Sequence, residues 1–129
     1  MLENKVKVYT LIKLLSFIKF ESREFESREF AASPIVGEIL SDLLIQFNSS
    51  IGKEFSFTIK SDNRFEKTIV NSIKNRLKDT DEWNEMNSDN QKEYIIDLAS
   101  PYILEEETIY SIINYKNNYS NNDEKNSLS

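Results

Sequence analysis

The chain of 129 residues contains no cysteine and no histidine. Without cysteine there can be no disulfide and no thiolate zinc site, and without histidine there can be no Ser–His–Asp triad. Carboxylates, lysine, tyrosine, serine and threonine remain as groups that could carry chemistry. With this limited set of groups we expect no catalytic residue, no metal ligand and no cofactor.

Glycine and proline are also scarce, with two of each. That is too few for the many tight turns of a β-sandwich or barrel. Hydrophobic residues make up 39% of the chain and aromatic residues 12%, which is enough for a packed core. A chain of this length fits one domain.

Long hydrophobic runs are missing as well. The most apolar stretch, residues 6–20, is interrupted by Lys7, Lys13 and Lys19, so no run approaches the roughly 20 residues that span a bilayer. The same lysines are incompatible with the apolar core of a secretory signal. We expect a cytoplasmic protein with no membrane contact.

Helical spacing dominates the first half of the chain. Residues 3–19 carry an apolar stripe broadened by Leu14 and Phe17, which predicts a central helix buried on most sides. Ser33-Pro34 is a helix start signal, and Gly52 can end the helix that follows.

Between residues 62 and 78 the pattern predicts a helix capped by Asp62. Its inward residues are expected to be Phe65, Ile69, Val70, Ile73 and Leu77, and its outer face basic, with Arg64, Lys67, Lys74, Arg76 and Lys78.

The C-terminal part gives three further signals. Thr80 begins a short turn around Trp83. Ser88 and Gln91 form a capping box for a helix that buries Tyr94, Ile95 and Leu98. Ser100-Pro101 resembles the earlier start signal and predicts a last helix through Ile109, Ile112 and Ile113.

Two segments do not follow the helical pattern. Residues 54–60 alternate, and since no partner strand is evident we expect an extended segment that presses Phe55, Phe57 and Ile59 onto the helices. Residues 21–30 are a tandem repeat of Glu-Ser-Arg-Glu-Phe. Its period of five matches neither helix nor strand, and we interpret it as a local duplication that lengthens a connection or short helix.

Together these patterns predict an all-α fold, a single domain of five to seven helices with a short extended segment at about 54–60. The helical domain is expected to span residues 1–118, and a loose polar tail residues 119–129.

Charge is distributed unevenly. Residues 1–78 carry 13 basic and 10 acidic side chains, whereas residues 79–107 carry ten acidic side chains and one basic one. Like charges at helical spacing are mildly unfavourable, so stability alone does not favour such a cluster. A concentrated acidic surface accelerates association with a basic partner, and aromatic anchors provide affinity.

The residues that we expect to bind a partner are Asp79, Asp81, Glu82, Trp83, Glu85, Asp89, Glu93 and Asp97. The competing interpretation is a solvated face that aids solubility, with some carboxylates complementing helix dipoles and Trp83 in the core.

Other sites fit the sequence less well. A calcium loop beginning at Asp79 would place Trp83 and Asn84 where an oxygen ligand and a glycine are needed. The basic face at residues 64–78 could contact nucleic acid, but the net charge of −6 opposes this, and we expect no direct nucleic-acid binding.

In size, acidity and a composition typical of an AT-rich bacterial gene, the chain resembles bacterial immunity proteins of toxin–immunity (toxin–antitoxin) pairs, including those of contact-dependent growth inhibition systems. The resemblance implies an antidote that covers the active site of a basic toxin. We expect this toxin to be a nuclease, because nucleases carry positive charge to hold phosphates. Two alternatives remain: a non-catalytic regulatory or adaptor subunit, and an enzyme that uses carboxylates alone.

Overall fold

The computed structural model describes the backbone of residues 2–22, 24, 27–60 and 63–128, and the side chains of residues 4–22, 24, 27–60 and 63–118. Its elements, in chain order, are α1 (Leu2–Ser16), the π-helical turn η1 (Phe17–Glu21), α2 (Ser27–Ala31), α3 (Pro34–Ser50), β1 (Thr58–Ile59), α4 (Arg64–Lys78), the 3-10 helix η2 (Asp81–Glu85), α5 (Ser88–Ala99), β2 (Ile103–Leu104) and α6 (Glu106–Leu128). The prediction of an all-α single domain is confirmed.

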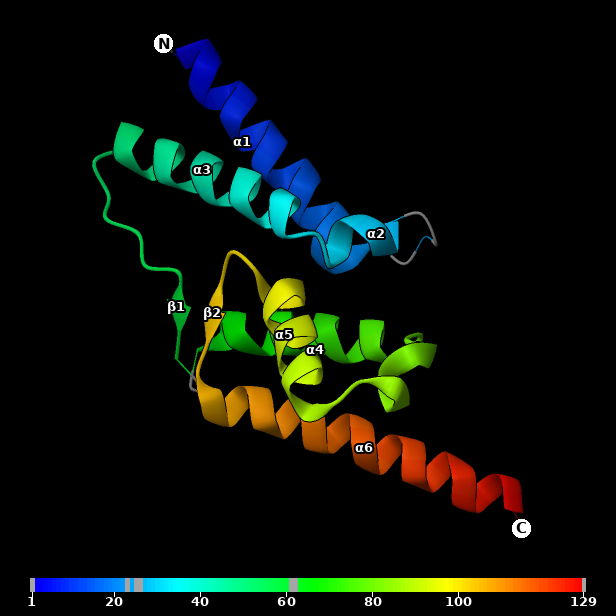
Figure 1. Cartoon of the computed structure of the whole chain (residues 1–129). Helices are drawn as coiled ribbons and strands as arrows, with labels where there is room; N and C mark the ends of the chain where they lie inside the picture. Colours follow the sequence, from blue (N-terminus) through cyan, green and yellow to red (C-terminus); the bar gives the residue numbers. More distant parts are fainter. Residues whose placement is uncertain (1, 23, 25–26, 61–62, 129) are drawn as a thin grey trace.

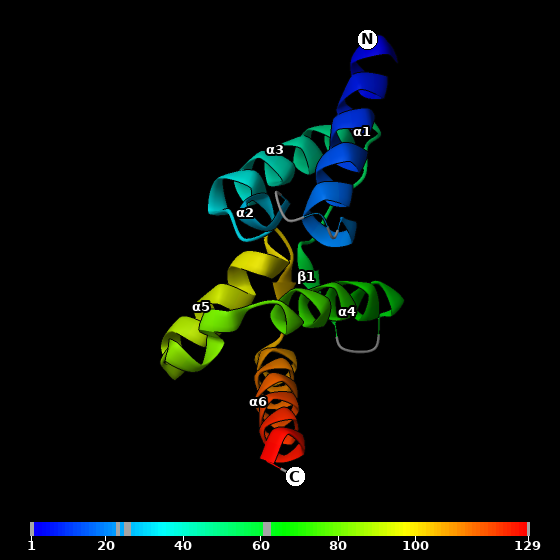
Figure 2. The ribbon, with the colours of Figure 1, turned by 90° about the vertical axis from the view of Figure 1, so that its right-hand side faces the viewer.

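The helices form two groups (Figure 1). The pair α1 and α3, joined through η1 and α2, lies at one end of the molecule, and α4, α5 and α6 form the rest. A view turned by 90° shows the same separation, with α6 on the far side from α1 and α3 (Figure 2). We call α1, η1 and α3 the hairpin, and α4–α6 the body.

Each group has its own cluster of buried apolar residues. The body cluster is the larger one and includes Ile69, Ile73, Leu77, Trp83, Ile95, Leu98 and Ile112. The hairpin cluster has three fully buried members, Ile12, Leu40 and Leu44. Phe20 and Tyr102 pack against both clusters, with ring centroids 5.8 Å apart, so an aromatic pair connects the two cores.

The prediction that the first helix is central and buried on most sides is wrong. In α1 only Ile12 is fully buried among the described residues, while Leu11 and Leu14 are exposed. The reason is that α1 packs mainly against α3 and η1, at the edge of the fold, and not against the body. Its broad apolar surface is therefore largely uncovered.

The extended segment has a partner that the sequence analysis missed. β1 pairs with β2 in a parallel register, Thr58 with Ile103 and Ile59 with Leu104. Ser100-Pro101 does not start the last helix: α5 ends just before it, β2 follows, and α6 begins at Glu106. Of the three apolar residues in 54–60, Ile59 is buried, Phe57 is half-buried and Phe55 is exposed.

Helix starts agree with the sequence in one case and differ by one residue in another. The hydroxyl of Ser33 accepts a hydrogen bond from the backbone N–H of Val36, as predicted for α3. α5 is capped by Asn87 and not by Ser88, because the Asn87 side chain accepts the N–H of Asn90. Asparagine is as good an N-cap as serine.

The start of α4 is also capped by asparagine, since Asn63 accepts the N–H of Phe65, and Asp62 lies outside the described residues. Within α4, Ile69, Ile73 and Leu77 are buried as predicted. Phe65 is exposed and Val70 half-buried, so the inward stripe is narrower than expected.

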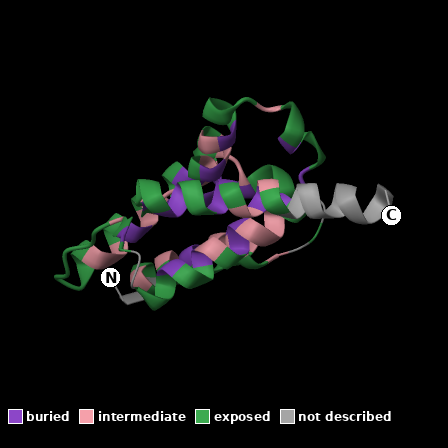
Figure 3. Cartoon of the chain, turned by 90° about the horizontal axis from the view of Figure 1, so that it is seen from below, coloured by how far each residue is buried: buried purple, intermediate pink, exposed green. Residues whose placement is uncertain are grey.

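The last helix is amphipathic. Seen from below, α6 carries both buried and exposed residues along its described length (Figure 3). Its backbone is helical as far as Leu128, through the residues for which the sequence predicts a loose tail. Their side chains are outside the described part, and the loose tail stays a prediction.

Gly37 lies where α3 meets the C-terminal end of α5. A Cβ built on Gly37 would stand 2.9 Å from the Cβ of Ser100, with the Ser100 hydroxyl nearer still. We therefore expect Gly37→Ala to lower the free energy of unfolding by about 1 kcal/mol, because overpacking outweighs the gain in helix propensity. Urea unfolding measures the change.

The control for this prediction is Gly37→Ala combined with Ser100→Gly, which removes the atoms that Cβ would meet. The two changes should be less than additive. A stabilised Gly37→Ala variant would show that the helix tolerates a side chain at this contact.

Candidate functional site

Seven carboxylates follow one another from the end of α4 through η2 and along α5. We call them the acidic surface: Asp79, Asp81, Glu82, Glu85, Asp89, Glu93 and Asp97. Asp89, Glu93 and Asp97 are spaced by four residues, which puts them along one side of α5. Gln91, in the first turns of α5, donates to the backbone oxygen of Trp83, and this places η2 beside that end of α5.

Six of the seven side chains are exposed, and Asp97 is half-buried. Asp79 forms an ion pair with Arg28 at 3.8 Å, with both side chains largely in solvent, so the pair contributes little to stability. Within the part of the chain that the structure describes, no other ion pair involves the acidic surface. Among the described residues, its negative charge is therefore largely uncompensated by ion pairs with basic side chains.

Trp83 does not belong to this surface. The expectation that it anchors a partner is therefore corrected. Its side chain is 1% exposed and lies in the body cluster. The indole Nε1 donates to Oδ1 of Asn117 on α6 at 2.9 Å. Trp83 instead holds η2 against α5 and α6, which leaves the carboxylates on either side of it facing solvent.

Asp97 differs from the other six carboxylates because it lies near the hairpin. Burial and the charge of Glu93 raise the pKa of Asp97, while the nearby ammonium of Lys19 opposes the shift. Asp97 therefore belongs partly to the acidic surface and partly to the contact between hairpin and body.

The remaining acidic residues of the 79–107 segment, Glu105, Glu106 and Glu107, follow β2. Glu106 accepts a hydrogen bond from Lys92 at 3.2 Å. This bond, together with the charge of Glu106, raises the pKa of Lys92. The one lysine of the acidic segment is thus paired with Glu106 of α6, and it also interacts more weakly with Asp89 of the acidic surface.

The sequence analysis did not identify the structural importance of one buried lysine, Lys19. Lys19 is 1% exposed, and its Nζ donates to the backbone oxygens of Ala31 at 2.5 Å and Asp97 at 2.8 Å. Both oxygens belong to the C-terminal turns of helices, α2 and α5, where carbonyls lack helical partners and a positive charge is favourable. Burial lowers the pKa of Lys19 to about 8; Asp97 acts against this shift and Arg76 adds to it.

Arg76 and Ser72 of α4 donate hydrogen bonds to backbone oxygens of η1, as Lys19 does to those at the ends of α2 and α5. Arg76 Nη2 donates to the backbone oxygens of Ile18 at 3.0 Å and Lys19 at 3.3 Å, and the Ser72 hydroxyl donates to that of Phe20 at 2.6 Å. The placement of Arg76 on a basic outer face was therefore wrong: it is half-buried, and this burial lowers its pKa. We call Lys19, Ser72 and Arg76 the polar seam.

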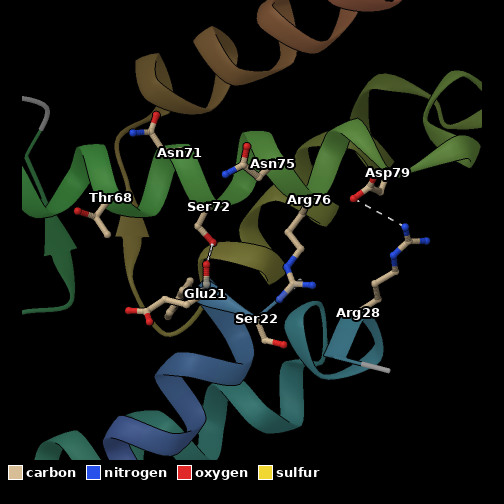
Figure 4. Close-up of a pocket in the computed structure, with 10 residues that line it drawn as sticks. Glu21, Ser22, Arg28, Thr68, Asn71, Ser72, Asn75, Arg76 and Asp79 are labelled. Atoms are coloured by element: carbon tan, nitrogen blue, oxygen red, sulfur yellow. Dashed lines mark hydrogen bonds and ion pairs between the residues drawn. The ribbon is translucent and has the colours of Figure 1, made fainter. Parts of the chain in front are cut away.

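A polar cleft of about 370 Å³ lies along the seam, between η1 and α4 (Figure 4). Arg76 and Ser72 point from α4 toward η1, and the pair of Arg28 and Asp79 closes one end. The guanidinium of Arg76 uses three of its five N–H donors within the protein, on two carbonyls and the hydroxyl of Ser27. The arrangement is suited to holding helices together.

The second copy of the pentapeptide repeat contributes to the same contact. Ser27 is buried in α2 and accepts a hydrogen bond from Arg76 Nη1 at 3.3 Å, while its hydroxyl donates to the backbone oxygen of Glu24 at 2.6 Å. Ser22, the equivalent residue in the first copy, lies just after η1. The repeat lengthens the connection from η1 to α3 and adds a short helix to it.

Among the side chains that the structure describes, no group of three or more acidic residues is arranged to hold a metal ion. No helix in the described part has the length and apolar character needed to cross a membrane. Comparison of the chain with known protein families, with curated proteins and with solved structures finds no match.

Proposed function

We propose that the protein is an immunity protein that binds and neutralises a basic toxin through the acidic surface of η2 and α5. The observation that carries the proposal is the concentration of seven carboxylates on two adjacent elements, with one weak ion pair to the rest of the described chain. A solvated helix face usually intersperses several lysines among its acids, whereas α5 carries one lysine, Lys92, and this lysine is paired with Glu106 of α6.

The physical basis of the proposal is charge complementarity. A toxin that cleaves RNA or DNA must hold phosphates with basic residues. An acidic inhibitor uses the same positive potential, which accelerates encounter and orients the two proteins. The carboxylates of α5, spaced by four residues, lie about 6 Å apart along the helix axis and form a row of negative charges.

Binding is favoured over catalysis because of how the polar groups are used. The arginine and serine that line the polar cleft bind backbone carbonyls, and they hold the hairpin on the body. The acidic surface, in contrast, points into solvent on a segment anchored by Trp83.

The test begins with the protein encoded beside this chain, since an antidote gene lies next to its toxin gene. We expect that neighbour to be basic, to inhibit growth when expressed alone and to lose that effect when this chain is present. A neighbour that is acidic, or whose toxicity this chain leaves unchanged, would contradict the proposal.

With the purified pair, Glu93→Lys is expected to weaken binding at least tenfold, mainly through slower association at low salt. The matched control is Glu54→Lys, an equal charge change at an exposed position before β1. Surface plasmon resonance at two ionic strengths measures both variants. Equal losses in the two variants, or binding that is insensitive to salt, would argue against steering by the acidic surface.

A further inference from the structure

The hairpin carries an apolar face that no described residue of the body covers. We define the hairpin face as Leu11, Leu14, Ile18, Ile35, Ile39 and Leu43. Leu14 is 53% exposed, Ile35 67% and Ile39 46%, and Ile18 and Leu43 are half-buried. A monomeric soluble protein rarely exposes a contiguous apolar surface built from two helices.

The spacing of the residues and their neighbours place this face on the side of the hairpin away from the body. Tyr9, Lys13 and Phe17 of α1 and η1 line a cleft of about 600 Å³ that also touches Phe65 and Tyr102. Leu11, Leu14 and Ile18, spaced by three and four residues, lie on average about 130° around the helix axis from them.

The same argument holds for α3. Gly37 meets Ser100 of the body, and Leu40 and Leu44 are in the hairpin cluster, which leaves Ile35 and Ile39 on the outside. In Figures 1 and 2 the side of α1 and α3 opposite the body faces open space in both views.

Charges of opposite sign flank the two halves of this face. On α1 the charge beside this face is Lys7, since Lys13 lines the cleft on the body side, whereas α3 carries Glu38 and Asp42 and no basic residue. Glu38 and Asp42 each follow an exposed isoleucine by three residues, so they lie between the apolar stripe and a groove that they line with Ser100 and Pro101. On α1, Lys7 precedes Leu11 by four residues and borders the stripe. Among the described residues, none of these three side chains forms an ion pair.

We infer that the hairpin face binds a second copy of this chain. A two-fold dimer brings the same surface of both subunits together, so the surface must be complementary to itself. This surface meets that requirement when the basic α1 of one copy lies against the acidic α3 of the other. The two hairpins then form a four-helix assembly with the apolar stripes inside.

The assembly leaves the acidic surface free. α5 approaches the hairpin from the body side, where the backbone oxygen of Asp97 binds Lys19. Self-association is therefore independent of toxin binding, and either proposal can fail without the other.

Sedimentation equilibrium of the full chain tests the inference. At tens of micromolar we expect the wild type to be a dimer and Leu14→Glu and Ile39→Glu to be monomers. The matched control is Ile96→Glu on α5, which introduces the same charge at a site that is 42% exposed but belongs to the body and not to the hairpin. Circular dichroism establishes that each variant is folded.

A charge exchange keeps the test valid even if the glutamate variants unfold. Lys7→Glu alone and Glu38→Lys combined with Asp42→Lys alone should each dimerise at least tenfold more weakly than the wild type. Mixing the two variants should restore association, because each contact again joins opposite charges. A monomeric wild type, a dimer that Leu14→Glu and Ile96→Glu weaken equally, or a mixture that remains monomeric would overturn the inference.

Discussion

Replacing Trp83 with alanine is expected to lower the free energy of unfolding by about 4 kcal/mol. The side chain is the largest among the fully buried ones, and its removal leaves a cavity between η2, α5 and α6. The change also leaves the Asn117 side chain without its indole donor. Urea unfolding followed by circular dichroism measures the loss, since Trp83 is the only tryptophan and its fluorescence is lost in the variant.

Trp83→Phe separates the two contributions. It keeps most of the apolar volume but removes the hydrogen bond to Asn117, and we expect a smaller loss of about 1–2 kcal/mol. If Trp83 were instead a partner-binding anchor, alanine would weaken partner binding and leave unfolding almost unchanged.

Lys19→Ala is expected to lower the free energy of unfolding by about 3 kcal/mol at pH 7. The variant leaves the oxygens of Ala31 and Asp97 without their buried donor and removes three packed methylene groups. Relief from burying a charge offsets part of this loss. The control is Lys67→Ala at an exposed position of α4, which should change the free energy of unfolding by less than about 0.5 kcal/mol.

The effect of Lys19 should grow with pH. Because burial lowers its pKa to about 8 from 10.5, the unfolded chain binds more protons than the folded one between these two values. Stability contributed by Lys19 therefore rises as the pH increases through this window. We expect the difference between wild type and Lys19→Ala to be about 2 kcal/mol larger at pH 10 than at pH 7. A difference that shrinks with pH would mean that the folded protein favours the charged lysine.

Local signals in the sequence predicted the helices well where one face meets a core. Ser33-Pro34 and the stripe that follows predicted α3, and Ile69, Ile73 and Leu77 predicted the inner side of α4. These features depend on residues three or four apart, so the sequence contains them directly.

Features that depend on distant contacts were missed. The partner of β1 lies more than 40 residues away in a two-residue strand, and no short-range pattern indicates it. Lys19 falls within an apolar run and looks like an interruption, because nothing local shows that the ends of α2 and α5 meet there. The exposure of Leu14 likewise depends on where α1 packs, not on its own spacing.

The acidic surface also combines features that the local sequence shows with one that depends on distant contacts. A count of charges along the sequence locates its carboxylates, and their exposure follows from helical geometry. The role of Trp83 could not be inferred this way, since a tryptophan beside acidic residues has the same local pattern in a core and in an interface.

The two buried clusters differ in size, and this has a consequence for motion within the native state. The hairpin is held by three fully buried residues of its own, the Phe20–Tyr102 pair and the hydrogen bonds of the polar seam, whereas the body has a much larger apolar core. Partial opening therefore begins at α1 and α3 while α4–α6 remain folded. Backbone amides of the hairpin exchange with solvent through this local opening, and those of the body exchange only when the whole chain unfolds.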